Sequence, residues 1–425
     1  MFTNKDEAIY YIENIKRKEK RTNLNRMQEA LNMLGNPQNA YKVIHVAGTN
    51  GKGSTVAYLT NILCEAGFNV GSFISPYVIT FNERIMYNLN YISDDDLLKY
   101  ANIIYDIKQE LEKKDEVITF FEFITLMGLL YFKDKKVDYA VIEVGLGGIL
   151  DATNIFSHAT RIITNIGFDH MNALGNTLSE IALKKLGILH QNENLITAVD
   201  SSLLDEFKSY SNNLNSKLYW VNQNVNDIKE TFNGVTFIYK NIVYQTPLLG
   251  IFQAYNAALA IEALSLCEPN ISKEIIQKGL DKTIWPGRLQ VIRKNPTIII
   301  DGGHNIHGID AVVKSIKGLT NKKIHVLFTA LKDKEIDKML SSLDEIALDY
   351  IFTTINDTRA SSIDDILRFN KKTYKAIPDY KEALRYITDK YGSNDIVLIT
   401  GSLHFISLVT VSYTHLRAHE TRSNL

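Results

Sequence analysis

Short runs of β-branched residues alternate along this chain with longer segments whose apolar residues recur at helical spacing. In the first half, strands are predicted at residues 41–47, 69–74, 137–145 and 161–167, and helices at 54–67, 93–113, 119–132 and 176–189. A strand, a helix and a second strand in this order form a βαβ unit, and successive units build a mainly parallel sheet. The alternation therefore predicts an α/β fold.

The alternation is interrupted after about residue 218 and later resumes. Asn233-Gly234 lies between two β-rich runs, which predicts a small β hairpin region. Pro286 and Pro296 mark a linker, beyond which strands and helices alternate again as far as residue 400. We expect a second, smaller α/β domain from about residue 295.

Composition narrows the class of protein. The chain has 425 residues, a net charge of -1 and two cysteines, Cys64 and Cys267, in no metal-binding spacing. The balanced charge argues against nucleic acid as a partner, because such proteins carry a basic face. No run of about 18 apolar residues predicts a membrane helix, and the N-terminus lacks a secretory pattern. We expect a cytoplasmic monomer that does not bind membranes.

A glycine-rich loop follows the first predicted strand and opens a helix. It reads HVAGTNGKGSTV over residues 45–56, and its spacing departs from the usual phosphate loop, G-x-x-x-x-G-K-[ST]. Glycines allow several backbone N–H groups to point at one anion, and the helix N-terminus favours negative charge. Lys52 could reach terminal phosphates and Ser54 or Thr55 could ligate Mg²⁺, although a turn without chemistry would also use glycine. The strand–loop–helix context favours the phosphate site.

Acidic and histidine residues follow two further strands. Glu143 ends one strand, and Asp169-His170 follow another, where ligands bind in parallel α/β sheets. A carboxylate there could hold Mg²⁺ against phosphate oxygens, whereas the alternative is a solvent-facing glutamate. A lone histidine is more often structural than a metal ligand. The metal interpretation therefore depends on the neighbouring motifs.

Other polar residues give weaker signals when each is taken alone. Lys185 lies on an amphipathic helix, where a lysine is usually solvated. Arg288 stands in the linker and could bind phosphate through two parallel hydrogen bonds. Asp301 and His304 follow the first strand of the second domain, in a turn that glycine and asparagine alone could explain.

The motifs gain meaning from their order. The segments HVAGTNGKGST, SPYVITFNERI, TFFEFIT, EVGLGGILDATN, ITNIGFDHMNALGNT, LKKLGI, GIFQAYNAALA, WPGR and DGGHN span about residues 20–405. In that order they resemble the folylpolyglutamate synthase and dihydrofolate synthase family of Mur-ligase-like, ATP-dependent amide ligases. The short spacing of the loop resembles that family's own phosphate loop.

The resemblance implies a domain plan. A Mur-ligase-like ATP-binding domain with a P-loop would occupy residues 1–290, and a C-terminal, Rossmann-like glutamate-ligase domain residues 295–411. The second domain would close over the site. Residues 412–425 carry little apolar content, and we expect a non-native or disordered tail.

The resemblance also assigns residues. Those implied at the nucleotide are Gly48, Thr49, Asn50, Gly51, Lys52, Gly53, Ser54, Thr55, Asn256, Arg288, Asp301 and His304. The implied Mg²⁺ ligands are Ser54, Ser75, Glu143 and His170, and the implied catalytic residues are Lys52, Lys185 and His170. Lys185 resembles a lysine that family members carboxylate, which would replace its cation by a carbamate able to support a second metal ion.

The implied reaction uses ATP and Mg²⁺ to join L-glutamate to a folate or to dihydropteroate through an acyl phosphate. A different Mur-like amide ligase and a homologue that binds nucleotide without catalysis remain alternatives. The departures from the family pattern are Ile149 in place of a cation, Lys184 in place of a glutamate, Gly303, Ile306 and Asn25. None of them replaces a residue assigned to metal or phosphate.

Overall fold

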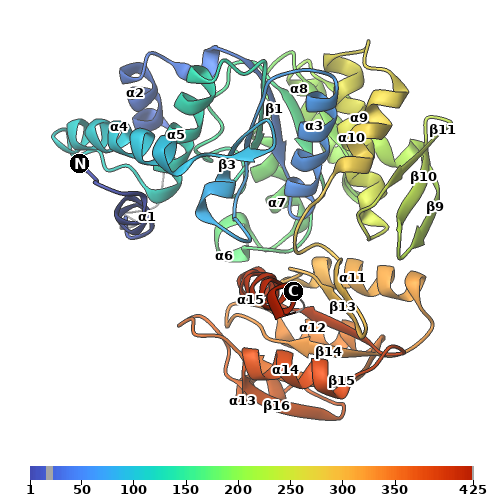
Figure 1. The fold of residues 1–425 in the computed structure, drawn as a ribbon. Helices are drawn as coiled ribbons and strands as arrows, with labels where there is room; N and C mark the ends of the chain where they lie inside the picture. The colour runs from blue at the N-terminus through green and yellow to red at the C-terminus, as the bar shows by residue number, and fades with distance from the viewer. Residues whose placement is uncertain (16–22, 424–425) are drawn as a thin grey trace. The chain divides into compact units, whose positions relative to one another are not determined.

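The structure, a computed structural model, describes residues 1–15 and 23–423, with side chains as far as residue 413. The chain divides into two compact units (Figure 1). The first comprises residues 1–225, 239–241 and 255–283, and the second residues 226–238, 242–254 and 284–425. Among the described helices, none is long and apolar enough to cross a membrane.

An eight-stranded sheet forms the centre of the first unit, in the order β4-β3-β2-β5-β1-β6-β7-β8. All neighbouring strands run parallel except the β2–β3 and β3–β4 pairs. This confirms the mainly parallel sheet. The strands are β1 (Lys42–Ala47), β2 (Val70–Phe73), β3 (Ile85–Tyr87), β4 (Asn90–Tyr91), β5 (Tyr139–Glu143), β6 (Thr160–Ile163), β7 (Asn194–Thr197) and β8 (Lys217–Trp220).

Helices cover both faces of this sheet. Val43 and Ala47 of β1 belong to two hydrophobic cores on one face, the first built with α1, α2, α4 and α5 and the second with α7 and α8. Helix α3 packs against α10, whose Gly279 would bring a β-carbon within 2.5 Å of Ile62. The helices are α1 (Lys5–Glu13), α2 (Asn25–Met33), α3 (Lys52–Glu65), α4 (Asp94–Glu112), α5 (Phe120–Asp134), α6 (Met171–Leu174), α7 (Leu178–Leu186), α8 (Leu204–Asn213), α9 (Phe252–Cys267) and α10 (Lys273–Lys282).

A small three-stranded sheet, ordered β11-β10-β9, contains the predicted hairpin. Its strands are β9 (Val225–Thr231), β10 (Gly234–Tyr239) and β11 (Ile242–Thr246). Gly234 has a φ of 126°, and a β-carbon there would lie 2.1 Å from the Thr246 carbonyl oxygen. Glycine is therefore required at the turn, as Asn233-Gly234 predicted.

The second unit is a separate α/β layer structure, as expected. Its sheet has the order β12-β13-β17-β14-β15-β16, and only the β12–β13 pair is antiparallel. Ile299 faces one hydrophobic core and Ile300 the other. Its elements are β12 (Gln290–Lys294), β13 (Thr297–Ile300), β14 (Ile324–Phe328), β15 (Ala347–Thr354), β16 (Tyr374–Asp379), β17 (Ile396–Thr400), α11 (Ile306–Leu319), α12 (Ile336–Leu343), α13 (Ile363–Leu367), α14 (Tyr380–Lys390) and α15 (Leu403–Ser423).

Two boundaries differ from the expected plan. Most of the small sheet groups with the second unit, because the Glu230 carboxylate accepts a hydrogen bond from Gly250 N and Ile251 N donates to Ser315 of α11. The backbone of the expected tail is helical as far as Ser423, where it continues α15. Leucine, arginine, alanine and glutamate, which occur in this segment, are residue types that favour helix.

Candidate functional site

Polar residues of the first unit gather where four strands end. Strand β1 lies between β5 and β6, and β2 lies beside β5, with all four parallel. The glycine-rich loop follows β1, Glu143 ends β5, and Ser75 follows β2. Carboxyl ends of parallel strands lie at one edge of a sheet, which is where ligands bind in open α/β folds.

The loop has a backbone path that only glycine fits. Gly48 and Gly51 have φ values of 147° and 83°, and Gly51 is the N-cap of α3. A β-carbon on Gly48 would lie 1.8 Å from Thr164 Oγ1, and one on Gly51 would lie 2.4 Å from Asn256 Oδ1. Asn256 is buried on α9, so the predicted nucleotide residue lies against the loop.

Two residues beyond β6 fix the loop and were not singled out from the sequence. Thr164 Oγ1 donates to the Asn50 carbonyl at 2.6 Å, and Asn50 N donates to Asn165 Oδ1 at 2.9 Å. Thr49 Oγ1 also lies within hydrogen-bond distance of Gly167. Their place directly after a strand that neighbours β1 is the signal that could have identified them.

The loop lysine connects the loop to the acidic residue. Lys52 Nζ donates to the carbonyls of Gly48 and Thr49, each at 3.2 Å, and lies 3.9 Å from Glu143 Oε1. The other carboxylate oxygen of Glu143 accepts from Ser75 N at 3.3 Å. Three predicted site residues, Lys52, Ser75 and Glu143, therefore belong to one chain of contacts.

A buried arginine orients Ser75. Arg84 Nη1 donates to Ser75 Oγ at 3.2 Å, and its guanidinium lies over the rings of Tyr77, Phe81 and Phe120 at 4.9–5.4 Å. Burial lowers the pKa of Arg84 to about 10. It remains a cation at neutral pH, beside a hydroxyl predicted to bind metal.

Lys185 is a buried amine, not the solvated charge that its helix suggested. It is 4% exposed, and its Nζ donates to the Gly48 carbonyl at 2.8 Å. Burial lowers its pKa to about 7, and the nearby cation of Lys52 acts in the same direction. The side chain of the neighbouring Lys184 is exposed, and it does not contribute to the lowered pKa of Lys185.

Ser54 and Thr55, in the first turn of α3, are both buried. Thr55 Oγ1 donates back to the Gly51 carbonyl at 3.0 Å, and Ser54 is 3% exposed. The Thr55 hydroxyl is therefore engaged with the loop backbone. Ser54 remains the residue of this pair predicted to bind Mg²⁺.

His170 lies on an exposed turn. It precedes α6 with a φ of 49°, and its Nε2 is 4.0 Å from Asp169 Oδ2. Among the side chains of residues 1–15 and 23–413, no group of three or more His, Cys, Asp and Glu residues is arranged to hold a metal ion. The predicted Mg²⁺ ligands include only two such residues, Glu143 and His170, and otherwise rely on hydroxyl groups.

The second unit has its own polar cluster after β13. Asp301 is buried and accepts hydrogen bonds from Leu289 N at 2.8 Å and Gly303 N at 2.7 Å. Burial raises its pKa, and the nearby Arg288 cation opposes that shift. His304 Nδ1 is 2.9 Å from the Gly302 carbonyl, so this nitrogen carries the proton. The predicted residues Arg288, Asp301 and His304 are thus close together.

The structure shows where the residues that depart from the family pattern lie. Ile149 is 48% exposed, and its backbone N donates to the Lys184 carbonyl at 3.0 Å. Gly303 donates to Asp301, Ile306 begins α11, and Asn25 is exposed at the start of α2. Ile149 therefore changes the exposed edge of the glycine turn while its backbone contact to α7 is kept.

Comparisons with known proteins match nearly the whole chain. Residues 46–264 match the family model of the Mur ligase middle domain, and residues 287–403 that of the Mur ligase glutamate ligase domain. A Bacillus subtilis protein named dihydrofolate synthase/folylpolyglutamate synthase is 37% identical over 96% of this chain and 98% of its own length.

Solved structures of proteins with these names also match this chain over nearly its whole length. The E. coli FolC structure in complex with DHPP and ADP matches with a TM-score of 0.88 and 26% identity, covering 98% of this chain and 99% of that one. A bifunctional folylpolyglutamate synthase/dihydrofolate synthase with Mn, AMPPNP and L-glutamate bound matches with a TM-score of 0.85 and 26% identity, covering 96% and 98%.

Proposed function

Because this chain belongs to the folylpolyglutamate synthase/dihydrofolate synthase family of Mur ligases, we propose that it joins L-glutamate to a folate at the expense of ATP. The acceptor is dihydropteroate, tetrahydrofolate or both. The observation that carries the proposal is the chain of contacts from Lys185 and Lys52 through the phosphate loop to Glu143 and Ser75.

The loop fits a nucleotide phosphate. Gly48 and Gly51 leave no room for a side chain between the loop and its neighbours, and α3 directs its N-terminus at the loop. Lys52 already lies over two loop carbonyls, where a cation can meet terminal phosphate oxygens. ATP is therefore the co-substrate that this loop suits.

The oxygen ligands suit Mg²⁺. Ser54, Ser75 and Glu143 offer hydroxyl and carboxylate oxygens, which a small hard cation prefers, and His170 would add a nitrogen ligand. When bound, Mg²⁺ would neutralise charge on the phosphate oxygens. Glu143 would then exchange its contact with Lys52 for the metal, which frees the lysine for phosphate.

The chemistry needs carboxylate activation. A carboxylate resists attack by an amine because its oxide is a poor leaving group. Transfer of the γ-phosphoryl group of ATP to an oxygen of that carboxylate gives an acyl phosphate and ADP. The glutamate amine then attacks the carbonyl carbon, the amide forms, inorganic phosphate leaves and the amine loses a proton. Lys52, on the phosphate loop, stabilises the charge on the transferred group.

Lys185 suits carboxylation. Burial lowers its pKa to about 7, so the neutral amine is available at neutral pH, and a neutral amine can attack CO₂. The products are a carbamate and a proton. The resulting anion would lie near the Lys52 cation that disfavours the protonated amine, so the modification removes a repulsion between like charges.

The polar cluster of the second unit is also suited to a nucleotide phosphate. Arg288 can bind phosphate oxygens, and Asp301 fixes the backbone of the turn that carries His304. A family structure was solved with Mn, AMPPNP and L-glutamate bound. We assign Arg288, Asp301 and His304 to nucleotide binding on this basis.

The test is a ligation assay on the purified protein. ATP, Mg²⁺ and L-glutamate are combined with dihydropteroate or with tetrahydrofolate, and products are identified by mass. One added glutamyl unit per ADP is expected on at least one acceptor, and Lys52→Ala should abolish glutamate-dependent ADP formation. ATP binding without any glutamyl addition would support the homologue without catalysis and overturn the proposal. Ligation of a cell-wall precursor alone would point to another Mur-like reaction.

A further inference from the structure

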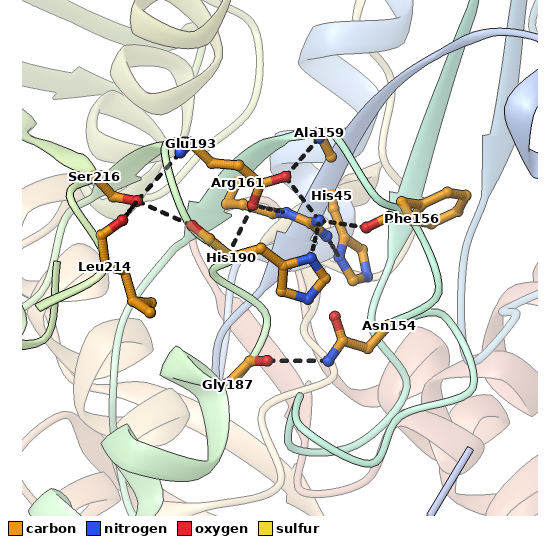
Figure 2. Close-up of polar contacts among 10 residues, drawn as sticks. All are labelled: His45, Asn154, Phe156, Ala159, Arg161, Gly187, His190, Glu193, Leu214 and Ser216. Atoms are coloured by element: carbon orange, nitrogen blue, oxygen red, sulfur yellow. Dashed lines mark hydrogen bonds and ion pairs between the residues drawn. The ribbon is translucent and has the colours of Figure 1, made fainter. Parts of the chain in front are cut away.

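A buried arginine outside the contacts described above holds together a polar network beneath the site. Arg161 is 0% exposed and directly opposite His45 in the parallel pairing of β1 with β6. Figure 2 shows its guanidinium between His45 and Glu193. It donates to both carboxylate oxygens of Glu193, at 2.8 and 3.0 Å, and to the Phe156 carbonyl at 2.8 Å.

The direction of the hydrogen bonds from Arg161 is fixed. Arginine has no acceptor, so His45 Nδ1 must accept from Arg161 Nη1, at 2.8 Å. A neutral imidazole then carries its proton on Nε2, which donates to Thr153 Oγ1 at 2.7 Å. The Thr153 hydroxyl therefore donates to Asp151 Oδ1, at 2.6 Å. Every bond in this relay points from a buried cation toward a buried carboxylate.

Asp151 organises the glycine turn after β5. Its Oδ2 accepts from Leu146 N at 2.9 Å, and its Oδ1 also accepts from Thr153 N at 3.0 Å. The turn over residues 146–154 is thus built around this carboxylate. A change in the orientation of Asp151 would move the backbone of the turn.

The turn contacts the C-terminal end of α7. Ile149 N donates to the Lys184 carbonyl at 3.0 Å, and Asn154 Nδ2 donates to the Gly187 carbonyl at 3.0 Å (Figure 2). A β-carbon on Gly148 would lie 2.8 Å from the carbonyl oxygens of both Lys184 and Lys185. These hydrogen bonds satisfy backbone carbonyls at the C-terminal end of α7. They also fix the position of Lys185, whose side chain reaches the Gly48 carbonyl.

We propose that Arg161 is a positioning residue of the active site, which acts through His45, Thr153 and Asp151 to place Lys185 against the phosphate loop. Because Arg161 is 0% exposed, its role is assigned through other residues and not through contact with a substrate. A buried ion pair adds little net stability to a fold. Stabilisation by the Arg161–Glu193 pair is therefore a weak explanation for a buried arginine, and its hydrogen bond to His45 points to a positioning role. The inference rests on the proposed function only where Lys185 is taken as an active-site group.

Thr153 offers the sharpest test because its hydroxyl can be removed with almost no change in the shape or the charge of the side chain. Thr153→Val keeps the shape of the side chain and breaks the relay, whereas Thr153→Ser keeps the hydroxyl. In CO₂-depleted buffer, acetylation of Lys185 by acetic anhydride, which transfers its acetyl group to a neutral amine and releases acetate, is followed by mass spectrometry. Lys108, on α4 and 6% exposed, serves as the internal reference for a buried lysine.

Thr153→Val should raise the acetylation rate of Lys185 by roughly fivefold or more while that of Lys108 is unchanged. It should also lower kcat about tenfold or more, with KM for ATP within about twofold. Thr153→Ser should restore both properties. Equal acceleration of Lys108, or unchanged Lys185 labelling in Thr153→Val, would overturn the proposal and indicate a role in general stability only.

Two further variants cover the case in which Thr153→Val does not fold. His45→Met removes both relay bonds of the imidazole, and His45→Gln offers an acceptor and a donor in their place. The Met variant should show faster labelling of Lys185 than the Gln variant, and equal rates would contradict the relay. The labelling does not require catalysis, so it decides the positioning role even if the ligation assay finds no product.

Discussion

Lys185 Nζ donates a hydrogen bond to the Gly48 carbonyl, 2.8 Å away, although the two residues are 137 positions apart in sequence. The contact places a buried amine on the backbone of the phosphate loop. Because Lys52 Nζ binds the same carbonyl, two lysines share one acceptor. This arrangement is unfavourable while both amines are protonated, which makes Lys185 the most informative residue to alter.

Lys185→Met should stabilise the fold and abolish ligation. The pKa of Lys185 is about 7 in the folded protein and 10.5 as the ordinary value, so the unfolded chain binds the proton more tightly between these pH values. Wild-type stability therefore rises with pH across this range, by about 1.4 kcal/mol per pKa unit for a fully buried group. At pH 7 we expect the variant to gain on the order of 1–3 kcal/mol in free energy of unfolding.

The gain of Lys185→Met should shrink toward pH 10, which denaturant unfolding in CO₂-depleted buffer at pH 7 and pH 9.5 measures. Lys184→Met, at the exposed neighbouring position, is the matched control and should leave the free energy of unfolding close to that of the wild type. A Lys185→Met variant less stable than wild type at pH 7 would contradict the description of a strained buried amine.

Gly48→Ala should destroy nucleotide binding as well as reduce stability. Its φ of 147° disfavours a side chain, and a β-carbon would collide with Thr164 Oγ1. Gly67→Ala is the control, because Gly67 also has a positive φ, 89°, with no heavy atom within 4 Å of the added carbon. We expect Gly67→Ala to cost about 1–2 kcal/mol of stability and to leave ATP affinity unchanged. Isothermal calorimetry with ATP separates the two effects, and equal ATP affinities would refute the steric argument.

Glu143→Gln should reduce kcat by about 100-fold, because the amide keeps the shape of the side chain but not its charge. The Mg²⁺ concentration that gives half-maximal activity should rise as well. Activity measured across a Mg²⁺ titration checks both effects. If the variant keeps the wild-type Mg²⁺ dependence, Glu143 is not a metal ligand and serves Lys52 and Ser75 alone.

Stability should fall as the pH drops below about 6.5. Burial and the Arg161 cation hold the pKa of His45 well below its ordinary 6.5, and the same causes lower the pKa of His190. The unfolded chain therefore takes up protons first, and the free energy of unfolding is lost progressively below pH 6.5. His45→Gln should flatten the dependence between pH 6.5 and pH 5. Thermal unfolding across this range is the measurement, and an unchanged slope would show that His45 does not titrate in that way.

The sequence was sufficient to predict the layers of the fold and the loop, because these depend on local patterns. The strand before Gly48, the helix after it and the Asn233-Gly234 hairpin are all present. Local patterns did not reveal that Lys185 is buried while Lys184 is exposed. Both residues lie on one amphipathic helix, α7. They differ in burial because only the side of the helix that carries Lys185 faces the phosphate loop.

Residues that act through long-range contacts were also missed. Thr164 and Asn165 could have been inferred once β6 was placed beside β1, since they follow that strand directly. The pairing of His45 with Arg161 needs the register of two strands far apart in sequence. Domain boundaries shifted for a similar reason, because Glu230 binds a loop that pattern alone did not connect to it.

The most direct test of the central claim follows one oxygen atom. An acceptor folate is labelled with ¹⁸O in the carboxylate that receives glutamate and is incubated with the protein, ATP, Mg²⁺ and L-glutamate. Ligation through an acyl phosphate transfers one labelled oxygen to each inorganic phosphate released, which mass spectrometry detects. Label in the phosphate together with ADP is the predicted result. Unlabelled phosphate during product formation, or release of AMP and pyrophosphate, would contradict the account.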